Sequence, residues 1–167
     1  MKRVVFVCIV SLLMLSVSCS KEGPGRFEGS WSFKTSGSLT VASKDSEGNV
    51  TGVLPVSFVT EAGQMHVVRK EDEEEMLVTM NVIGGDVVAY QAVASGKELS
   101  LLASARRLSL NVGDMTVIHP IVMAEGTGKR YDDVLVIEFQ FSGSLEVGNV
   151  TYEIIGSDVE CVAVQNE

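Results

Sequence analysis

The chain has 167 residues, of which 46% are hydrophobic and 21% are charged, and its formal net charge is −9. This length predicts one domain, and the ordinary content of apolar residues excludes a disordered or collagen-like polymer. Because 22 acidic residues stand against 13 basic ones, we expect no nucleic acid among the partners. Three cysteines are too few for a disulfide framework.

The first 18 residues predict a secretory leader. Lys2 and Arg3 form a positively charged start, and an uncharged, mainly apolar run follows over residues 4–17. A transmembrane helix needs about 20 apolar residues, whereas a shorter run is typical of a signal peptide. Loss of the leader removes both basic residues and no acidic one, so 11 basic residues remain against 22 acidic ones and the net charge becomes −11. A surface with this charge repels acidic polymers and anionic lipid headgroups.

Residues 16–19, Ser-Val-Ser-Cys, place small side chains directly before Cys19. This segment is similar to the lipobox of bacterial lipoproteins, in which the cysteine is acylated and becomes the first residue of the mature chain. The resemblance implies that Cys19 is the lipid attachment site and anchors the protein to a membrane, and Ser20 beside it favours the outer membrane. Residues 19–26 then form the lipidated cysteine and a flexible tether. The alternative is a secreted protein cut near Ser18.

Residues 27–167 predict a single β-domain. Apolar and polar residues alternate with a period of two in four segments: 31–41, 76–82, 135–141 and 150–154. Glycine-containing turns separate such segments, and residues 99–110 continue one of these stripes, so we expect a strand there as well. We therefore predict an all-β fold, an antiparallel up-and-down barrel of about 8–10 strands. A β-sandwich is the alternative.

Residues 27–31, Phe-Glu-Gly-Ser-Trp, resemble the Gly-x-Trp motif at the first strand of lipocalins. The layout of residues 27–164 also resembles that of calycin-like β-barrel lipoproteins, in which a lipobox leader precedes hairpins with Gly-Asn or Gly-Asp turns, as at residues 148–149. The resemblance implies a barrel that holds a lipid or a small apolar ligand. The Thr-Asp-Tyr motif of lipocalins, and their late arginine that packs on the tryptophan, are not placed in this sequence.

The interior of the predicted barrel is the candidate ligand-binding site. Six side chains on two stripes are expected to point inward: Trp31, Phe33, Leu135, Ile137, Phe139 and Phe141. In a barrel of about 8 strands, such residues either line a cavity or fill it, and both possibilities are open at this point.

No motif predicts a catalytic residue, a metal site or a cofactor. His66 and His119 lie in separate predicted strands, and Pro120 indicates an edge or a bulge. The consecutive carboxylates of residues 71–75 lack the spacing of a calcium loop, so we expect a solvated turn. Cys161 has no neighbouring basic residue and is expected to be a small buried hydrophobe.

The basic pairs Arg106-Arg107 and Lys129-Arg130 are too isolated for a basic stripe, and we expect exposed charges that protect sheet edges. Two functions follow from these observations. The first is a non-catalytic outer-membrane lipoprotein whose barrel binds a lipid or another small apolar ligand. The second is a cell-envelope interaction module, with a filled barrel or sandwich, that contacts a protein or polymer partner or acts as an inhibitor. The first predicts a hollow interior and the second a packed one, and the fold alone does not separate them.

Overall fold

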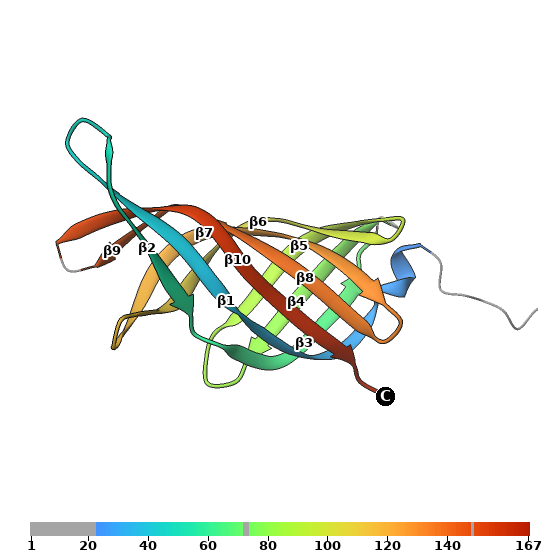
Figure 1. Ribbon diagram of the computed structural model, residues 1–167. Helices are drawn as coiled ribbons and strands as arrows, with labels where there is room; N and C mark the ends of the chain where they lie inside the picture. Colours follow the sequence, from blue (N-terminus) through green and yellow to red (C-terminus); the bar gives the residue numbers. More distant parts are fainter. Residues whose placement is uncertain (1–22, 72–73, 148) are drawn as a thin grey trace, which may run out of the picture.

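The computed structural model describes residues 23–167, except residues 72–73 and 148. A short 3-10 helix and ten antiparallel strands follow one another along the chain (Figure 1). Their bounds are η1 Pro24–Arg26, β1 Gly29–Lys44, β2 Val50–Phe58, β3 Glu61–Arg69, β4 Glu75–Val82, β5 Val87–Ser95, β6 Glu98–Val112, β7 Met115–Tyr131, β8 Val134–Ser142, β9 Ser144–Val147 and β10 Val150–Gln165. Within this part of the chain, no helix has the length and hydropathy that a membrane span requires.

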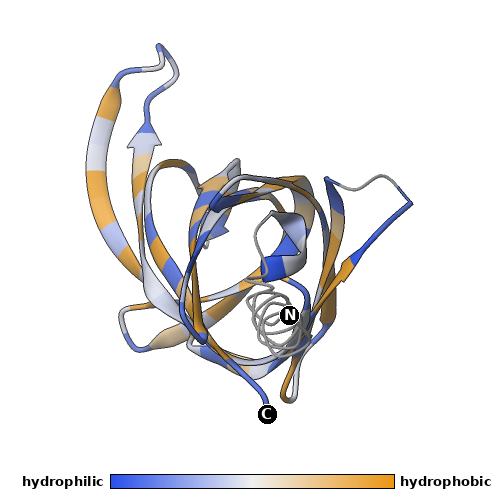
Figure 2. Cartoon of the chain, turned by 90° about the vertical axis from the view of Figure 1, so that its right-hand side faces the viewer, coloured by the Kyte–Doolittle hydropathy of each residue, from blue (hydrophilic) through white to orange (hydrophobic). Residues whose placement is uncertain are grey.

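Eight strands close into a ring, which is seen end-on in Figure 2. Their order is β1-β3-β4-β5-β6-β7-β8-β10, and β10 pairs with β1 from Trp31↔Gln165 to Ser43↔Tyr152. The two remaining strands are additions at one end, because β2 pairs with the second half of β1 and β9 with the start of β10. The predicted antiparallel up-and-down barrel is therefore confirmed, and the fold is not the alternative sandwich.

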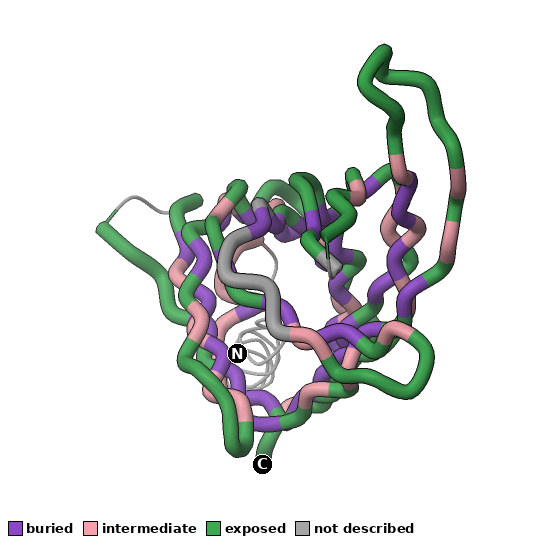
Figure 3. The backbone as a smooth tube through the Cα atoms, turned by 90° about the vertical axis from the view of Figure 1, so that its left-hand side faces the viewer, coloured by how far each residue is buried: buried purple, intermediate pink, exposed green. Residues whose placement is uncertain are grey.

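The two ends of the barrel differ. At one end, which we call the closed end, β1 begins and β10 ends. The turns β3–β4, β5–β6 and β7–β8 also lie at this end. Here η1 lies across the ring in the end-on view and brings Phe27 into the core (Figure 2). At the opposite, open end, the hairpins β1–β2, β6–β7 and β9–β10 extend outward (Figure 3). Residues 24–26, which the sequence places in the tether, therefore form part of the folded barrel.

The period-two alternation explains how the core forms. Inward residues of each strand are buried and outward ones are exposed or half-buried, as β3 and β8 show along their lengths. Residues 99–110 lie in β6, so the strand predicted there is confirmed. In β6, however, the register shifts twice, between Leu101 and Ser104 and between Arg106 and Leu108. The first shift changes the alternation in β6, because odd-numbered residues point inward up to Leu101 and even-numbered residues point inward from Arg106 onward.

Candidate functional site

The six side chains of the predicted ligand site all lie in the core. Each is at most 5% exposed. Phe139 lies between other rings, with its centroid 5.6 Å from that of Tyr90 and 5.9 Å from that of Phe141, which is itself 6.0 Å from Phe58. The structure thus brings these residues together as packed core, and their contact with a ligand stays a prediction.

The barrel wall opens between β5 and β6. Ala92–Ser95 of β5 pair with residues 98–101 of β6, but Val87–Gln91 pair with β4 alone. On the other side of the gap, β6 turns away where its register shifts, and β2 joins it only from Leu110 onward. Two strand edges therefore diverge from the β5–β6 turn and leave a wedge-shaped opening, which we call the wedge.

A pocket of about 730 Å³ occupies the wedge, a volume within the range of about 300–1,000 Å³ that is usual for ligand sites. The β2–β3 junction, the β4–β5 hairpin and β6 form its walls. Its apolar side is made of Val59, Val82 and Val88, of which the last two also pack against the core. A second hollow of about 440 Å³ lies at the base of the open-end hairpins, beside the ion pair of Lys44 and Glu153.

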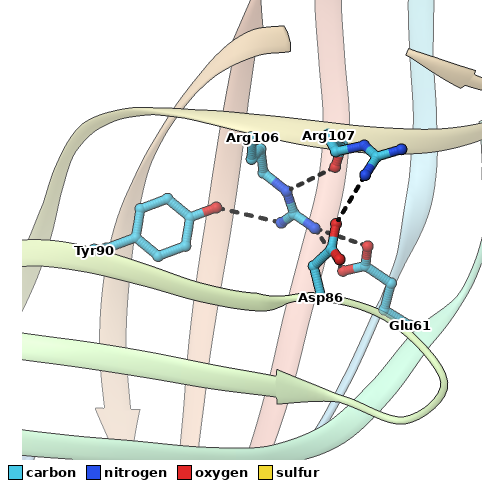
Figure 4. A network of polar contacts seen from close by, with 5 residues as sticks. All are labelled: Glu61, Asp86, Tyr90, Arg106 and Arg107. Atoms are coloured by element: carbon cyan, nitrogen blue, oxygen red, sulfur yellow. Dashed lines mark hydrogen bonds and ion pairs between the residues drawn. The ribbon is translucent and has the colours of Figure 1, made fainter. Parts of the chain in front are cut away.

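A buried ion pair closes the inner end of the pocket (Figure 4). Nη2 of Arg106 donates to both carboxylate oxygens of Glu61, at 2.7 and 2.8 Å, and Nη1 donates to the hydroxyl of Tyr90 at 3.2 Å. The side chain of Arg106 is 2% exposed and that of Glu61 is 14% exposed. The guanidinium also lies 5.9 Å from the ring centroids of both Phe58 and Phe141, an arrangement that favours a cation.

The environment keeps this site charged. Burial alone lowers the pKa of Arg106, but the fields of Tyr90 and Glu61 and their hydrogen bonds outweigh it and raise the pKa above the ordinary value. Burial raises the pKa of Tyr90, against the lowering effect of Arg106, so that its hydroxyl stays protonated. The pocket therefore has a fixed ion pair at its base, beneath apolar walls, and the neutral phenol of Tyr90 supports this pair from within the core.

The prediction that Arg106 is an exposed charge is wrong. The register shift between Leu101 and Ser104 turns position 106 inward, and a carboxylate on β3 neutralises it there. Arg107 is exposed, as predicted, and lies 3.8 Å from Asp86 on the β4–β5 hairpin, across the wedge (Figure 4). A sequence signal for the buried pair existed in Glu61, which stands at an inward position of a regular alternating strand.

Arg130 is half-buried, so the prediction that it is exposed is also wrong. Its guanidinium lies 5.1 Å from the ring centroid of Trp31, and Nη2 donates to Oε1 of Gln165 at 2.7 Å. The indole N–H of Trp31 donates to the carbonyl oxygen of Phe27 at 3.2 Å. Sequence reasoning missed this contact, although position 130 continues the inward phase of Ala124, Gly126 and Gly128.

The other candidate residues stand apart from the pocket. His66 is exposed and lies 3.0 Å from the hydroxyl oxygen of Ser30, whereas the side chain of His119 and residue Cys19 lie outside the described part. Of the acidic run, Glu71 and Glu74 are exposed between β3 and β4, and residues 72–73 are outside the description. Among the described residues, no group of three or more His, Cys, Asp or Glu side chains could hold a metal ion.

Cys161 is a buried free thiol opposite Thr35, so the prediction of a small buried hydrophobe is confirmed. Burial raises its pKa from 9.0 to about 12, which lowers the thiolate fraction at pH 8 about a thousandfold. We expect a thiol reagent to modify Cys161 at least a hundredfold more slowly in the folded protein than in guanidinium. Equal rates in both conditions would contradict the burial.

The same shift predicts a dependence of stability on pH. Between pH 9 and about 12 the unfolded chain loses the thiol proton and the folded chain keeps it. The stabilisation is therefore complete below pH 9 and is lost as the pH rises toward 12. In denaturant titrations, the free energy of unfolding of the unsubstituted chain should fall more steeply over this interval than that of Cys161→Ala. Parallel curves would show that burial does not shift the pKa.

Comparisons of this chain with family models, with curated proteins and with solved structures gave no match.

Proposed function

We propose that the protein is a lipid-anchored protein of the cell envelope that binds a lipid or another small, largely apolar ligand without catalysis. In this proposal Cys19 carries the lipid and holds a calycin-like barrel at the outer membrane. The observation that carries the ligand-binding part is the wedge pocket of about 730 Å³, with valine side chains on its walls. The packing of Arg130 on Trp31 supports the calycin-like relationship, because lipocalins have an arginine on this tryptophan.

The pocket suits a ligand with an apolar body and one polar group. Val59, Val82 and Val88 offer apolar surface, and burial of such surface gives about 25 cal/mol per Å². The carboxylate of Glu61, still 14% exposed, can accept a hydrogen bond from a ligand hydroxyl or amide. The charges around the pocket cancel, since Arg106 and Arg107 are matched by Glu61 and Asp86, so a ligand without net charge fits best.

Native mass spectrometry tests this function. Residues 20–167, produced in a bacterium and purified without detergent, should carry adducts of a few hundred daltons, on the order expected for ligands of such pockets. Ala105 is an exposed residue on the pocket wall, so Ala105→Trp should fill the pocket and remove the adducts. Ser36→Trp, at an exposed position of β1 away from the pocket, is the control and should retain them. A clean mass after offering sterols and other uncharged lipids would overturn the proposal.

A cell-envelope interaction module is the second candidate, and the packed interior favours it. The aromatic residues of β1, β2, β5 and β8 belong to one packed core, in which rings of β2, β5 and β8 lie against one another. If no small ligand binds, a protein or polymer partner on the outer surface becomes the better hypothesis. Neutralising Glu71, Glu74 and Glu75 should then weaken capture of that partner.

A further inference from the structure

An apolar patch lies on the outer wall near the closed end. Val134 and Val136 of β8 stand directly opposite Val164 and Val162 of β10. Their chain neighbours Leu135, Ile137, Cys161 and Ala163 are buried, so the four valines point outward. The cross-strand pairs continue into β7 and β1 and form two rows: Tyr131–Val134–Val164–Ser32 and Lys129–Val136–Val162–Lys34. We call these two rows the valine face, which is turned toward the viewer in Figure 1.

Three apolar side chains of the valine face are exposed, and Val134 and Val136 are half-buried. Val162 is 38% exposed, Val164 is 45% exposed and Tyr131 is 60% exposed. The outward positions of an antiparallel wall are normally polar, so a contiguous group of four valines and a tyrosine calls for a partner. The patch consists of only two short rows, however, and is too small for a stable protein interface, which buries about 800 Å² on each side.

Charges on this wall are sorted along the barrel axis. Lys34 and Lys129 flank the second row of the valine face. The next row toward the open end places Glu138 opposite Glu160, and Glu125 and Asp158 follow further along the same wall. Two lysines thus flank the second row, and the carboxylates of the next rows on β7, β8 and β10 lie toward the open end. The net negative charge of the chain therefore does not describe this surface.

Some carboxylates also lie near the valine face. Glu98 stands opposite Lys129 on β6, and Asp132 and Asp133 form the β7–β8 turn beyond the first row. A partner that meets the barrel end-on would contact the two aspartates first. A flat partner along the wall would contact the valines and lysines instead.

The start of the described chain indicates what this partner is. Nη2 of Arg26 in η1 donates to the carbonyl oxygen of Arg130 at 3.2 Å, and Arg130 donates in return to the carbonyl oxygen of Arg26. Since Arg130 precedes Tyr131, the chain enters the barrel beside the first row of the valine face. Cys19 and Gly23 are four steps apart along the chain, and at most about 3.6 Å per step this allows a span of roughly 14 Å.

We propose that the valine face lies on the surface of the lipid bilayer that holds the anchor at Cys19; this inference rests on the lipid anchor of the proposed function. The valines enter the boundary between headgroups and acyl chains, and Tyr131 takes the interfacial position that tyrosine favours. Lys34 and Lys129 reach lipid phosphates, while their methylene groups stay on the apolar surface. The barrel then lies on its side with Glu138 and Glu160 away from the membrane.

Site-specific fluorescence on the full, lipid-modified chain tests the proposal. Val164→Cys carries a polarity-sensitive maleimide dye on the valine face. Ile155→Cys is the matched control, because Ile155 is an apolar residue of the same strand, 53% exposed and nearer the open end. Cys161 is buried and stays unlabelled. In vesicles of phosphatidylethanolamine and phosphatidylglycerol, we expect a blue shift at position 164 and several-fold stronger quenching by brominated lipids there than at position 155.

The outcomes separate this inference from the proposed anchor. Dye uptake by the unsubstituted chain would reveal a free thiol at Cys19 and overturn the anchor itself. If the unsubstituted chain takes up no dye, the anchor at Cys19 stands. Equally weak quenching of the dyes at positions 164 and 155 would then overturn the contact between the valine face and the membrane. A blue shift at position 164 that depends on protein concentration in detergent would identify a second copy as the occupant instead. Lys34→Glu with Lys129→Glu should reduce the quenching at position 164 in these anionic vesicles, and an unchanged signal would contradict the role of the lysines.

Discussion

Glu61→Gln is expected to lower the free energy of unfolding by about 3–5 kcal/mol. The substitution keeps the shape of the side chain but leaves the guanidinium of Arg106, 2% exposed, without its counter-charge. The penalty arises from a buried cation that the folded state must accommodate and that water solvates in the unfolded chain. Urea denaturation followed by circular dichroism measures the effect.

The exposed ion pair across the wedge provides the control for this prediction. Arg107 and Asp86 lie 3.8 Å apart and are both largely exposed, so Asp86→Asn should cost at most about 1 kcal/mol. The double variant Glu61→Gln, Arg106→Met should recover part of the loss, because it removes the unpaired charge as well. Equal effects of Glu61→Gln and Asp86→Asn would show that Arg106 is solvated and that the ion pair does not close the pocket.

Trp31→Ala is expected to destabilise the barrel by about 3–5 kcal/mol. The indole is fully buried at the closed end, donates a hydrogen bond to Phe27 and carries Arg130 on its face. Its removal leaves a cavity beneath η1 and takes the aromatic surface from the guanidinium. Thermal and chemical denaturation report the loss of stability.

Two further variants locate the source of this effect. Trp31→Phe keeps an aromatic ring under Arg130 but lacks the indole N–H, so we expect an intermediate loss. Val53→Ala, at a position 57% exposed in the open-end hairpin, should change stability by less than about 0.5 kcal/mol. A loss at Val53 as large as that at Trp31 would mean that the open end contributes as much to the fold as the core.

The barrel could be predicted because a β-strand with one buried face has alternating apolar and polar residues in its sequence. Phe139 and Phe141 alternate with Glu138 and Gln140, and this pattern alone places two side chains inside and two outside. The inward positions of Trp31 and Phe33 follow in the same way. Strand pairing could be predicted less well. The second half of β1 pairs with β2 and its first half pairs with β3, and no residue pattern indicates this change of partner.

The pocket could not be predicted, because it depends on irregularities. Arg106 points inward only because the register of β6 shifts between Leu101 and Ser104, and a bulge shifts the alternation without a distinctive residue to mark it. The opening between β5 and β6 arises from pairing that stops at Ala92, which is a property of two strands together. The residue pattern of one strand cannot show where its hydrogen-bonded pairing with the neighbouring strand ends. The sequence therefore points to aromatic residues of the core as the ligand site, whereas other residues line the pocket.

The pairing of the first strand with the last one also has a consequence for the order of folding. β1 meets its early neighbours β2 and β3 as soon as they emerge, but its other edge pairs with β10, and Ser32 and Asn166 in contact there are separated by 134 positions. Because synthesis proceeds from the N-terminus, that edge of β1 stays open until β10 has been made. Contacts this distant close slowly, and an open edge invites pairing with other chains. The final residues of the chain thus control both the speed of folding and the escape from aggregation.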